Sequence, residues 1–329
     1  MRALLLIAFI HYTFLLNAQF APPVGQIGTT AIHKDSSIIV EWAAYASIER
    51  GLINISDPTA EFNGSNYATF GTIENTLGPA SGELSNVISL GDRGQITLTF
   101  NRYIIDGEGP DFCVFGNSLN DTFLELAFVE VSSDGEHFVR FPSVSLSQTE
   151  TQISGFGEVD AEKIYNLAGK YKVGYGVPFD LAELSDTSGI DIMAISHVRI
   201  IDVVGTIDTL YSSYDSQGNI INDPFPTPFD TGGFDLEAIG VINAGSTILA
   251  TSSNNTQQKA EIYPNPTSDF IHIKGNTGLV YIKNVNGKII KSFSHDKSSK
   301  VDIRELPKGL YFIQISTAKG NVIEKIMVQ

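Results

Sequence analysis

Short stretches of alternating apolar and polar residues, separated by Gly, Asn, Asp and Pro, recur along most of this chain. In the clearest of them, residues 94–100, Ile96, Leu98 and Phe100 alternate with polar residues. This period of two is typical of a half-buried β-strand. Helical periodicity is scarce, apart from one helical turn expected in each of residues 161–167 and 180–184. The chain is therefore predicted to be all-β, with a jelly-roll-like β-sandwich over residues 19–242.

Residues 259–329 repeat the pattern on a smaller scale. About six or seven short apolar runs are separated by turn signals, among them Asn286-Gly287, the strongest short-range hairpin signal. This predicts a small immunoglobulin-like β-sandwich. Residues 243–258 are small and polar, and we expect them to form a linker between the two sandwiches.

Four motifs of the C-terminal segment occur in a fixed order. They are Tyr263-Pro264-Asn265-Pro266-Thr267, residues 280–288, residues 306–315 and the closing stretch 320–329. Together they resemble the type A C-terminal sorting domain of the type IX secretion system of Bacteroidetes. The resemblance implies export through the outer membrane, removal of the tail by a sortase-like peptidase, and attachment to surface lipopolysaccharide or release. An ordinary immunoglobulin-like accessory domain is the alternative.

The N-terminal residues read as a secretory signal peptide, residues 1–18. Met1-Arg2 supplies a positive start, residues 3–16 are largely apolar, and Leu16-Asn17-Ala18 offers a cleavage site before Gln19. The apolar run is too short to cross a bilayer, and no other stretch is long and apolar enough, so we expect no transmembrane span.

Charge is divided unevenly along the chain. Residues 19–257 contain 31 Asp and Glu against 9 Lys and Arg, whereas residues 259–329 contain 6 against 11. We call residues 19–257 the passenger. A segment this acidic repels nucleic acid and anionic membranes and attracts cations. The alternative is that the acidic surface only keeps the protein soluble outside a cell. Cys113 is the sole cysteine and lies in an apolar run, so we expect a buried thiol and no intrachain disulfide.

An Asp-rich stretch, residues 202–235, is the strongest candidate for a metal site. Seven side-chain oxygen donors fall within these 34 residues, and the stretch holds no Lys or Arg that could neutralise them. Calcium takes six to eight oxygen ligands from carboxylates, amides and carbonyls. The candidate ligands are Asp202, Asp208, Asp215, Asn219, Asp223, Asp230 and Asp235, with Asp106 and Asp111 as a second cluster that also includes Glu108. The sequence thus predicts a structural calcium ion, and the alternative is that these residues only form turns.

Aromatic residues collect in loop-like sequence rich in Gly and Pro. The candidates for stacking on a ligand are Tyr175, Tyr211, Tyr214, Phe225 and Phe229. The alternative is that these rings pack the loops onto the sandwich.

Motifs of the passenger resemble a broad group of bacterial cell-surface proteins without a settled activity. They are residues 107–115, 125–135, 165–170 and 232–236. Relatives often carry Glu-Asn after a Val-Phe pair, whereas this chain has Gly116-Asn117 and so lacks that glutamate. The resemblance implies a jelly-roll-like fold and no particular reaction. Some relatives occur in nutrient uptake, including corrinoid uptake.

These observations favour a secreted, non-catalytic surface module that binds a glycan or a small nutrient, with a corrinoid as one possibility. His-Glu-x-x-His, Gly-x-Ser-x-Gly and phosphate-binding motifs are absent from the sequence. An extracellular polymer hydrolase is an alternative, since paired carboxylates can assemble from distant loops. A structural or adhesive surface protein is the other. The expected partners are the secretion machinery, its sortase-like peptidase and the ligand.

Overall fold

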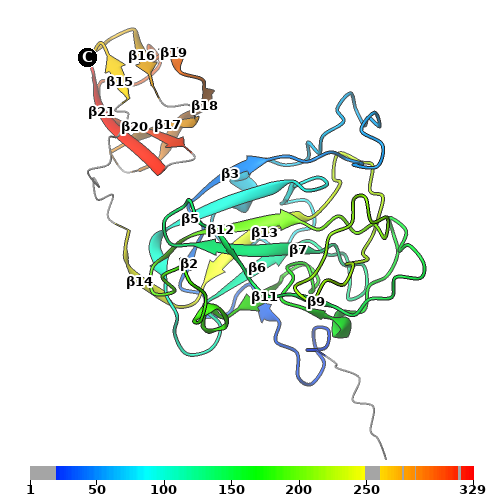
Figure 1. Ribbon diagram of the computed structural model, residues 1–329. Helices are drawn as coiled ribbons and strands as arrows, with labels where there is room; N and C mark the ends of the chain where they lie inside the picture. Colours follow the sequence, from blue (N-terminus) through cyan, green and yellow to red (C-terminus); the bar gives the residue numbers. More distant parts are fainter. Residues whose placement is uncertain (1–19, 249–259, 276–277, 286, 318–319) are drawn as a thin grey trace, which may run out of the picture.

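The computed structural model describes residues 20–248, 260–275, 278–285, 287–317 and 320–329. The predicted signal peptide and residues 249–258 of the predicted linker lie outside these ranges. Within them, regular structure is almost entirely β, with three short 3-10 turns (Figure 1). The all-β prediction is confirmed. None of the helical turns in the described ranges has the length and apolar character needed to span a membrane.

Two antiparallel sheets form the passenger. The first has the order β1 (Ile32–His33), β11 (Tyr175–Phe179), β6 (Phe112–Gly116), β13 (Asp235–Val241) and β2 (Glu41–Trp42), with β4 (Ile88–Ser89) also on β13. The second has the order β14 (Ala244–Thr247), β5 (Gln95–Ile104), β12 (Ile195–Asp202), β7 (Ala127–Ser132) and β8 (Val139–Arg140), with β3 (Tyr45–Glu49) on β5. A small separate pair joins β9 (Val144–Ser145) to β10 (Ile164–Tyr165).

The main core lies between these two sheets. Leu98 of β5 and Ile200 of β12 belong to the same buried cluster as Phe112 and Val114 of β6. Along β5 the apolar residues are buried and the intervening ones are partly exposed, as the alternation predicted. β7 is buried along its whole length, because a second apolar cluster that includes Phe128 and Ile164 of β10 covers its other face.

The boundaries of some elements differ from those expected from the sequence. Residues 244–247 form β14 on β5, so the passenger extends beyond residue 242, where we had expected the linker to begin. The predicted helical turns appear as η2 (Ala161–Lys163) and η3 (Leu181–Leu184), and a third 3-10 turn, η1 (Ile73–Thr76), was not predicted.

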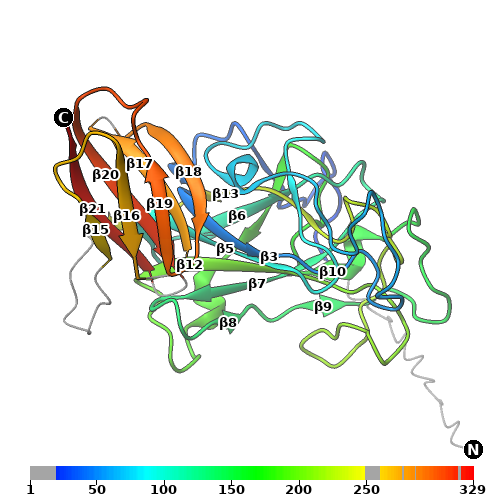
Figure 2. The same cartoon turned by 90° about the horizontal axis from the view of Figure 1, so that it is seen from above.

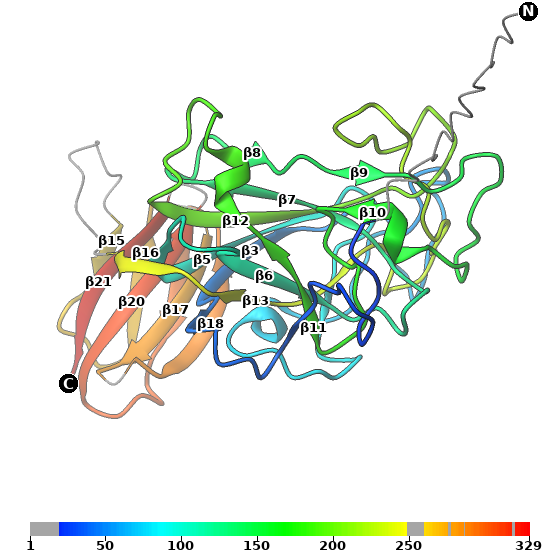
Figure 3. The ribbon, with the colours of Figure 1, turned by 90° about the horizontal axis from the view of Figure 1, so that it is seen from below.

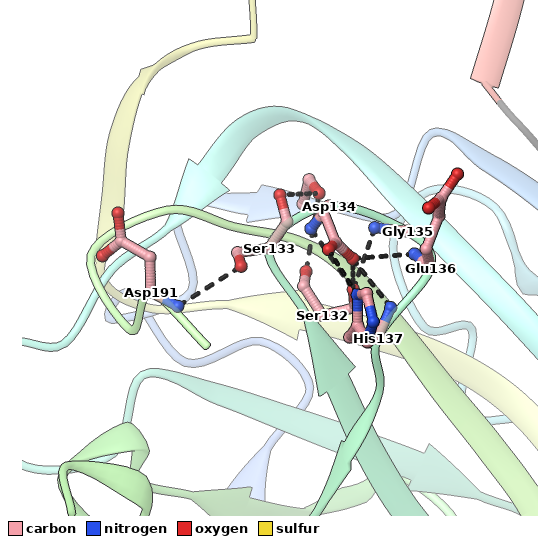
Figure 4. A network of polar contacts seen from close by, with 8 residues as sticks. Ser132, Ser133, Asp134, Gly135, Glu136, His137 and Asp191 are labelled. Carbon is pink, nitrogen blue, oxygen red and sulfur yellow. Dashed lines mark hydrogen bonds and ion pairs between the residues drawn. The ribbon is translucent and has the colours of Figure 1, made fainter. Parts of the chain in front are cut away.

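Asp134-Gly135, a dipeptide typical of hairpin turns, forms the turn between β7 and β8. Asp134 Oδ1 accepts hydrogen bonds from the backbone N–H groups of Glu136 and His137, both at 2.8 Å, and Asp134 Oδ2 lies 2.9 Å from His137 Nδ1 (Figure 4). The Ser132 hydroxyl accepts from the N–H of Gly135 at 2.9 Å. His137 and Asp134 are exposed, and their contacts account for this turn without a functional role.

The C-terminal segment forms its own two-sheet sandwich. One sheet has the order β15 (Glu261–Tyr263), β16 (Phe270–Lys274) and β19 (Ser298–Asp302); the other has β18 (Ile289–His295), β17 (Gly278–Asn284), β20 (Gly309–Thr317) and β21 (Gly320–Val328). Ile271, Ile282 and Ile313 are among its core residues. Figures 2 and 3 show this sandwich at one end of the passenger, with the long passenger loops gathered at the opposite end.

The two sandwiches touch through β17 and β3. The ammonium group of Lys283 lies 4.7 Å from the centre of the Tyr45 ring, and Leu279 and Tyr281 pack against the passenger core. This contact leaves the loop end of the passenger uncovered by the tail.

Candidate functional site

Three aspartates bring their carboxylates together where β6 begins and β11 ends. Two of them lie in the connection between β5 and β6, and the third follows β11. Asp106 follows β5, Asp111 precedes β6, and Asp180 follows β11, where its Oδ1 caps η3 by accepting from the N–H of Ala182 at 2.9 Å. One oxygen of each lies within 4.8 Å of the others. The pairing of Phe179 with Phe112 in β11 and β6 explains this, because it brings Asp180 next to Asp111.

The hydrogen bonds of this aspartate triad (Asp106, Asp111 and Asp180) leave one buried oxygen unsatisfied. Asp111 is fully buried, and its Oδ1 accepts from the Gly107 N–H and from Asn243 Nδ2, both at 2.8 Å. A Cβ at position 107 would lie 2.5 Å from the Asn243 amide, so a larger residue there would displace the amide that donates to Asp111. The buried Oδ1 of Asp106, by contrast, has no hydrogen-bond partner among the described residues.

Burial and repulsion both act on the triad. Burial raises the pKa of Asp111, hydrogen bonds from Asn243, Leu181 and Gly107 lower it, and the negative charge of Asp180 raises it further. No cationic side chain contributes to this shift. Carboxylate oxygens that converge without a cation, with an unsatisfied oxygen among them, form a donor set suited to a hard divalent ion such as calcium.

Sequence reasoning had selected Asp106 and Asp111 but missed Asp180. Asp180 stands 69 positions beyond Asp111 and was noted only as the start of a helical turn. Glu108, the other acidic residue of the predicted cluster, is exposed and is not a member of the triad.

The Asp-rich stretch leads to a second, more deeply buried set of acids. Asp202, Asp223 and Asp235 are each at most 6% exposed, and they neighbour Asp92 and Glu125, which the sequence analysis had not selected as ligands. We call these five residues the buried acid group.

Most members of the buried acid group hold loops in place. Asp202 accepts from the N–H groups of Phe234 at 2.7 Å and Arg93 at 3.0 Å. Asp223 Oδ2 accepts from the Leu126 N–H at 2.9 Å. In the same way Asp92 Oδ2 accepts from the Ile55 N–H at 2.6 Å.

Asp235 and Glu125 make different contacts. Asp235 accepts from the Ser89 hydroxyl and from Asn117 Nδ2. Glu125 is partly exposed, and no hydrogen bond to its carboxylate is found in the part of the chain that the structure describes.

Burial is the largest cause of raised pKa values throughout the buried acid group. It raises the pKa of Asp92 and of Asp235 to about 6. The pKa of Glu125 lies well above its usual value, first through burial and then through repulsion by Asp235, Asp223 and Asp202. The Arg50 guanidinium partly opposes the shift of Asp235, while it donates to the carbonyls of residues 70, 71 and 89.

The other predicted ligands of the Asp-rich stretch serve turns. The two carboxylate oxygens of Asp215 accept from the N–H groups of Ser145, Gln217 and Asn219 and from the Asn219 amide. Asp208 accepts from the Leu210 N–H at 3.0 Å, and Asp230 uses its backbone carbonyl for residues 69 and 70. In the ranges described, no three residues of the Asp-rich stretch bring carboxylate oxygens within 4.8 Å of one another.

The predicted stacking residues have different environments. Phe225 is 6% exposed, so its ring packs inside and cannot serve an exposed platform. Tyr175 makes an edge contact with His33, Tyr211 is partly buried, and Tyr214 is 44% exposed. Phe229 is partly exposed and contacts two further rings, those of Phe62 and Phe156.

Comparison with known proteins identifies the tail. Residues 261–329 match the family described as "Secretion system C-terminal sorting domain". This confirms the resemblance of the C-terminal sandwich to the type IX sorting domain. The protein is therefore a cargo of that secretion system, exported to the outer-membrane surface or the extracellular space.

Comparison of the whole chain with curated proteins and solved structures adds no argument about the passenger. No curated protein matches the sequence. The solved structures include a biofilm-associated protein BSP domain (13% identity, TM-score 0.19, covering 71% of this chain and 48% of that one). They also include a β-glucuronidase from Ruminococcus gnavus (11% identity, TM-score 0.18, covering 73% and 35%). The chain thus spans less than half of either structure, and likenesses this weak carry no argument.

Proposed function

We propose that the passenger is a non-catalytic binding module, displayed on the cell surface or released, that captures a glycan or a small nutrient and carries a structural calcium ion. The aspartate triad is the proposed ion site. The observation that carries this proposal is the buried, unpartnered Oδ1 of Asp106 beside two further carboxylates. A calcium ion there would tie the end of β5 to the starts of β6 and η3. We further propose that a sortase-like peptidase removes the tail.

The ligand-binding part of the proposal draws on the architecture. Long loops gather at the end of the sandwich opposite the tail (Figures 2 and 3), and loops held by a rigid scaffold are the usual place for binding residues. Glycans and corrinoids are the first ligands to screen.

A polymer hydrolase is the second candidate, and one observation favours it. Glu125 is partly exposed, its pKa is raised, and other carboxylates lie near it. A carboxyl group kept protonated beside an ionised partner is the arrangement of a general acid in glycoside cleavage. Release of reducing ends from a polysaccharide, lost in Glu125→Gln, would support the hydrolase over the binding module.

Thermal unfolding followed by tryptophan fluorescence tests the ion site. Trp42 is the sole tryptophan and lies in the passenger, 5.5 Å from the Phe115 ring, so its signal reports on that sandwich alone. Calcium at about one hundred times its dissociation constant should stabilise the passenger by about 2.7 kcal/mol relative to a chelator.

Matched variants locate the ion. Asp106→Asn should remove the calcium-dependent rise in the unfolding midpoint, whereas the exposed Asp186→Asn should keep it. If the wild-type protein shows no rise, the proposed ion does not exist. If Glu125→Gln removes the rise and Asp106→Asn keeps it, the ion lies in the buried acid group instead.

A further inference from the structure

Four phenylalanines from four separate loops form a row of rings at the loop end of the passenger. The ring centres are 5.8 Å apart for Phe62 and Phe229, 5.9 Å for Phe229 and Phe156, and 6.2 Å for Phe156 and Phe123. Phe156 is 77% exposed, and the other three rings are partly exposed. The sequence analysis had selected only Phe229, because the other three are isolated in sequence.

Exposed rings in loops often serve only to hold the loops together, but polar groups already do so here. Asn222 Oδ1 accepts from the Ile153 N–H at 3.0 Å, and its amide donates to the Gln148 and Thr151 carbonyls. On another loop, Asn120 Oδ1 accepts from the Phe123 N–H at 2.7 Å. These two loops therefore do not depend on the rings alone for their position, and their rings can also serve a ligand.

Phe156 is displayed by a tight turn. Its neighbours are Gly155 and Gly157, and the Gly157 N–H donates to the Ser154 carbonyl at 2.7 Å. A Cβ at position 155 would lie 2.3 Å from the Pro226 carbonyl oxygen, so only glycine lets this turn sit against residue 226. The turn therefore holds the backbone of Phe156 so that its ring stands at the surface, and a fixed backbone lowers the ordering cost of binding.

Acidic and amide-bearing residues stand close in sequence to three of the four rings. Glu61 and Asn63 flank Phe62, Asp121 is two positions from Phe123, and Asp230 follows Phe229. Among the described residues, one of these acids is paired with a cation: Lys172 lies 2.9 Å from Asp121. Such a rim repels anionic polymers and offers hydrogen-bond acceptors to hydroxyl groups.

We propose that this phenylalanine row binds a neutral polysaccharide chain, and this inference rests on the binding function proposed above. Successive sugar units would lay their apolar C–H faces on successive rings, while their hydroxyl groups donate to the flanking carboxylates and amides. Neighbouring ring centres lie about 6 Å apart, and the rings meet at angles of 79°, 42° and 22°, so they offer a stepped series of contacts and not one flat platform. Such a series suits a chain of separate sugar units better than a single broad ring system such as a corrinoid.

Affinity electrophoresis of the full chain in gels containing laminarin, galactomannan, xyloglucan or polygalacturonate tests this. The wild-type protein should be retarded by at least one neutral polysaccharide and not by polygalacturonate. Phe156→Ala should weaken that binding about five- to tenfold, since one aromatic contact is lost, and Phe123→Ala/Phe156→Ala should weaken it further. Leu210→Ala, which removes a 70% exposed apolar side chain from the residue 204–233 loop, is the matched control and should bind normally.

The outcomes separate the row from the binding function. Unfolding midpoints of the variants check that they fold. If the wild-type protein binds a neutral polysaccharide and folded row variants bind equally well, the row is not the site, although the binding function stands. Binding of cyanocobalamin alone, or retardation by polygalacturonate, likewise overturns the row as a neutral-glycan site. If neither the polysaccharides nor cyanocobalamin bind, the row and the binding function both fail.

Discussion

The passenger and the sorting domain are both antiparallel sandwiches, yet they treat acidic residues in opposite ways. The passenger buries Asp111, Asp202 and Asp223 to 3% exposure or less. Among the described residues of the sorting domain, the buried polar side chains are Thr267, His295 and Gln314, with no carboxylate. Its acids lie at the surface, as the exposed pair of Asp302 with Arg304 illustrates.

This difference indicates two sources of stability. The sorting domain is held by an apolar core, and its described residues bury no carboxylate. In the passenger, buried carboxylates anchor the loops, and each anchor requires a proton, a hydrogen-bond donor or a cation to offset the lost hydration. The predictions below test this contrast from the largest expected effect to the smallest.

The largest effect should come from pH. The pKa values of Asp92 and Asp235 rise from 3.8 to about 6 on folding. A raised carboxyl pKa adds stability that is fully present below pH 3.8 and is lost as the pH rises through 6. Each group therefore accounts for about 3 kcal/mol of stability at low pH that is absent at pH 8. The partly buried His197, whose pKa is lowered by burial, acts in the opposite sense as the pH falls below 6.5 and reduces the net change.

Urea unfolding in the presence of chelator, followed by Trp42 fluorescence, measures this dependence. The midpoint should be lower at pH 8 than at pH 4.5, where most of this stability is present, and calcium should reverse part of the loss at pH 8. A passenger equally stable at both pH values without calcium would contradict the idea that burial of these acids costs more than their hydrogen bonds return.

The next effect concerns the buried carboxylate that does have cations. Glu130 is 6% exposed, and its oxygens lie 2.8 Å from Arg140 Nη2 and 2.8 Å from Arg199 Nε. Glu130→Ala should destabilise the passenger by about 3 kcal/mol, at the low end for a buried pair because both arginines are partly exposed. Urea midpoints compare it with the exposed Glu136→Ala, which should change stability by less than about 0.5 kcal/mol. Equal effects of the two variants would show that the two arginines do not make Glu130 important for stability.

A smaller effect, of opposite sign, is expected at Glu125. No hydrogen bond to its carboxylate is found in the described part of the chain, and its pKa is raised by burial and by neighbouring acids. Glu125→Gln keeps the shape and removes the charge, so at pH 8 without calcium it should stabilise the passenger by about 1–2 kcal/mol. At pH 5 the gain should shrink, because the wild-type group is then increasingly protonated. Destabilisation at pH 8 in chelator would show that the ionised carboxylate has a favourable partner.

The sorting domain was predictable to a greater extent than the passenger, for a physical reason. Its motifs are local, because hairpins such as β17–β18 and β20–β21 join strands that are neighbours in sequence. In the passenger, β6 lies between β11 and β13, both far away in the chain, and that arrangement cannot be read from periodicity. The alternation of β5 was predicted correctly, whereas β3 and β11 were missed because Gly, Pro and Ala interrupt or blur their patterns.

The candidate site follows the same rule. Asp106 and Asp111 were found because they stand close together in sequence, but Asp180 needed the β6–β11 pairing. The Asp-rich stretch was noticed for its composition, and composition does not distinguish Asp215, which closes its own turn, from Asp202, which reaches across to residues 93 and 234. The phenylalanine row has no sequence signal, since its four rings are spread from residue 62 to residue 229.

The smallest effect is expected where the two sandwiches meet. The Lys283 ammonium lies 4.7 Å from the Tyr45 ring centre and donates to Gln314 at 2.8 Å. A double-mutant cycle of Tyr45→Leu with Lys283→Ala isolates the cross-domain term, and a partly exposed cation–π contact should give a coupling of about 0.5–1 kcal/mol in passenger stability. Lys288→Ala, at an exposed position of the same sandwich, should show none. A coupling of several kcal/mol would mean that the sandwiches fold as one unit, and the contrast between an ion-dependent cargo and an independent tag would then be wrong.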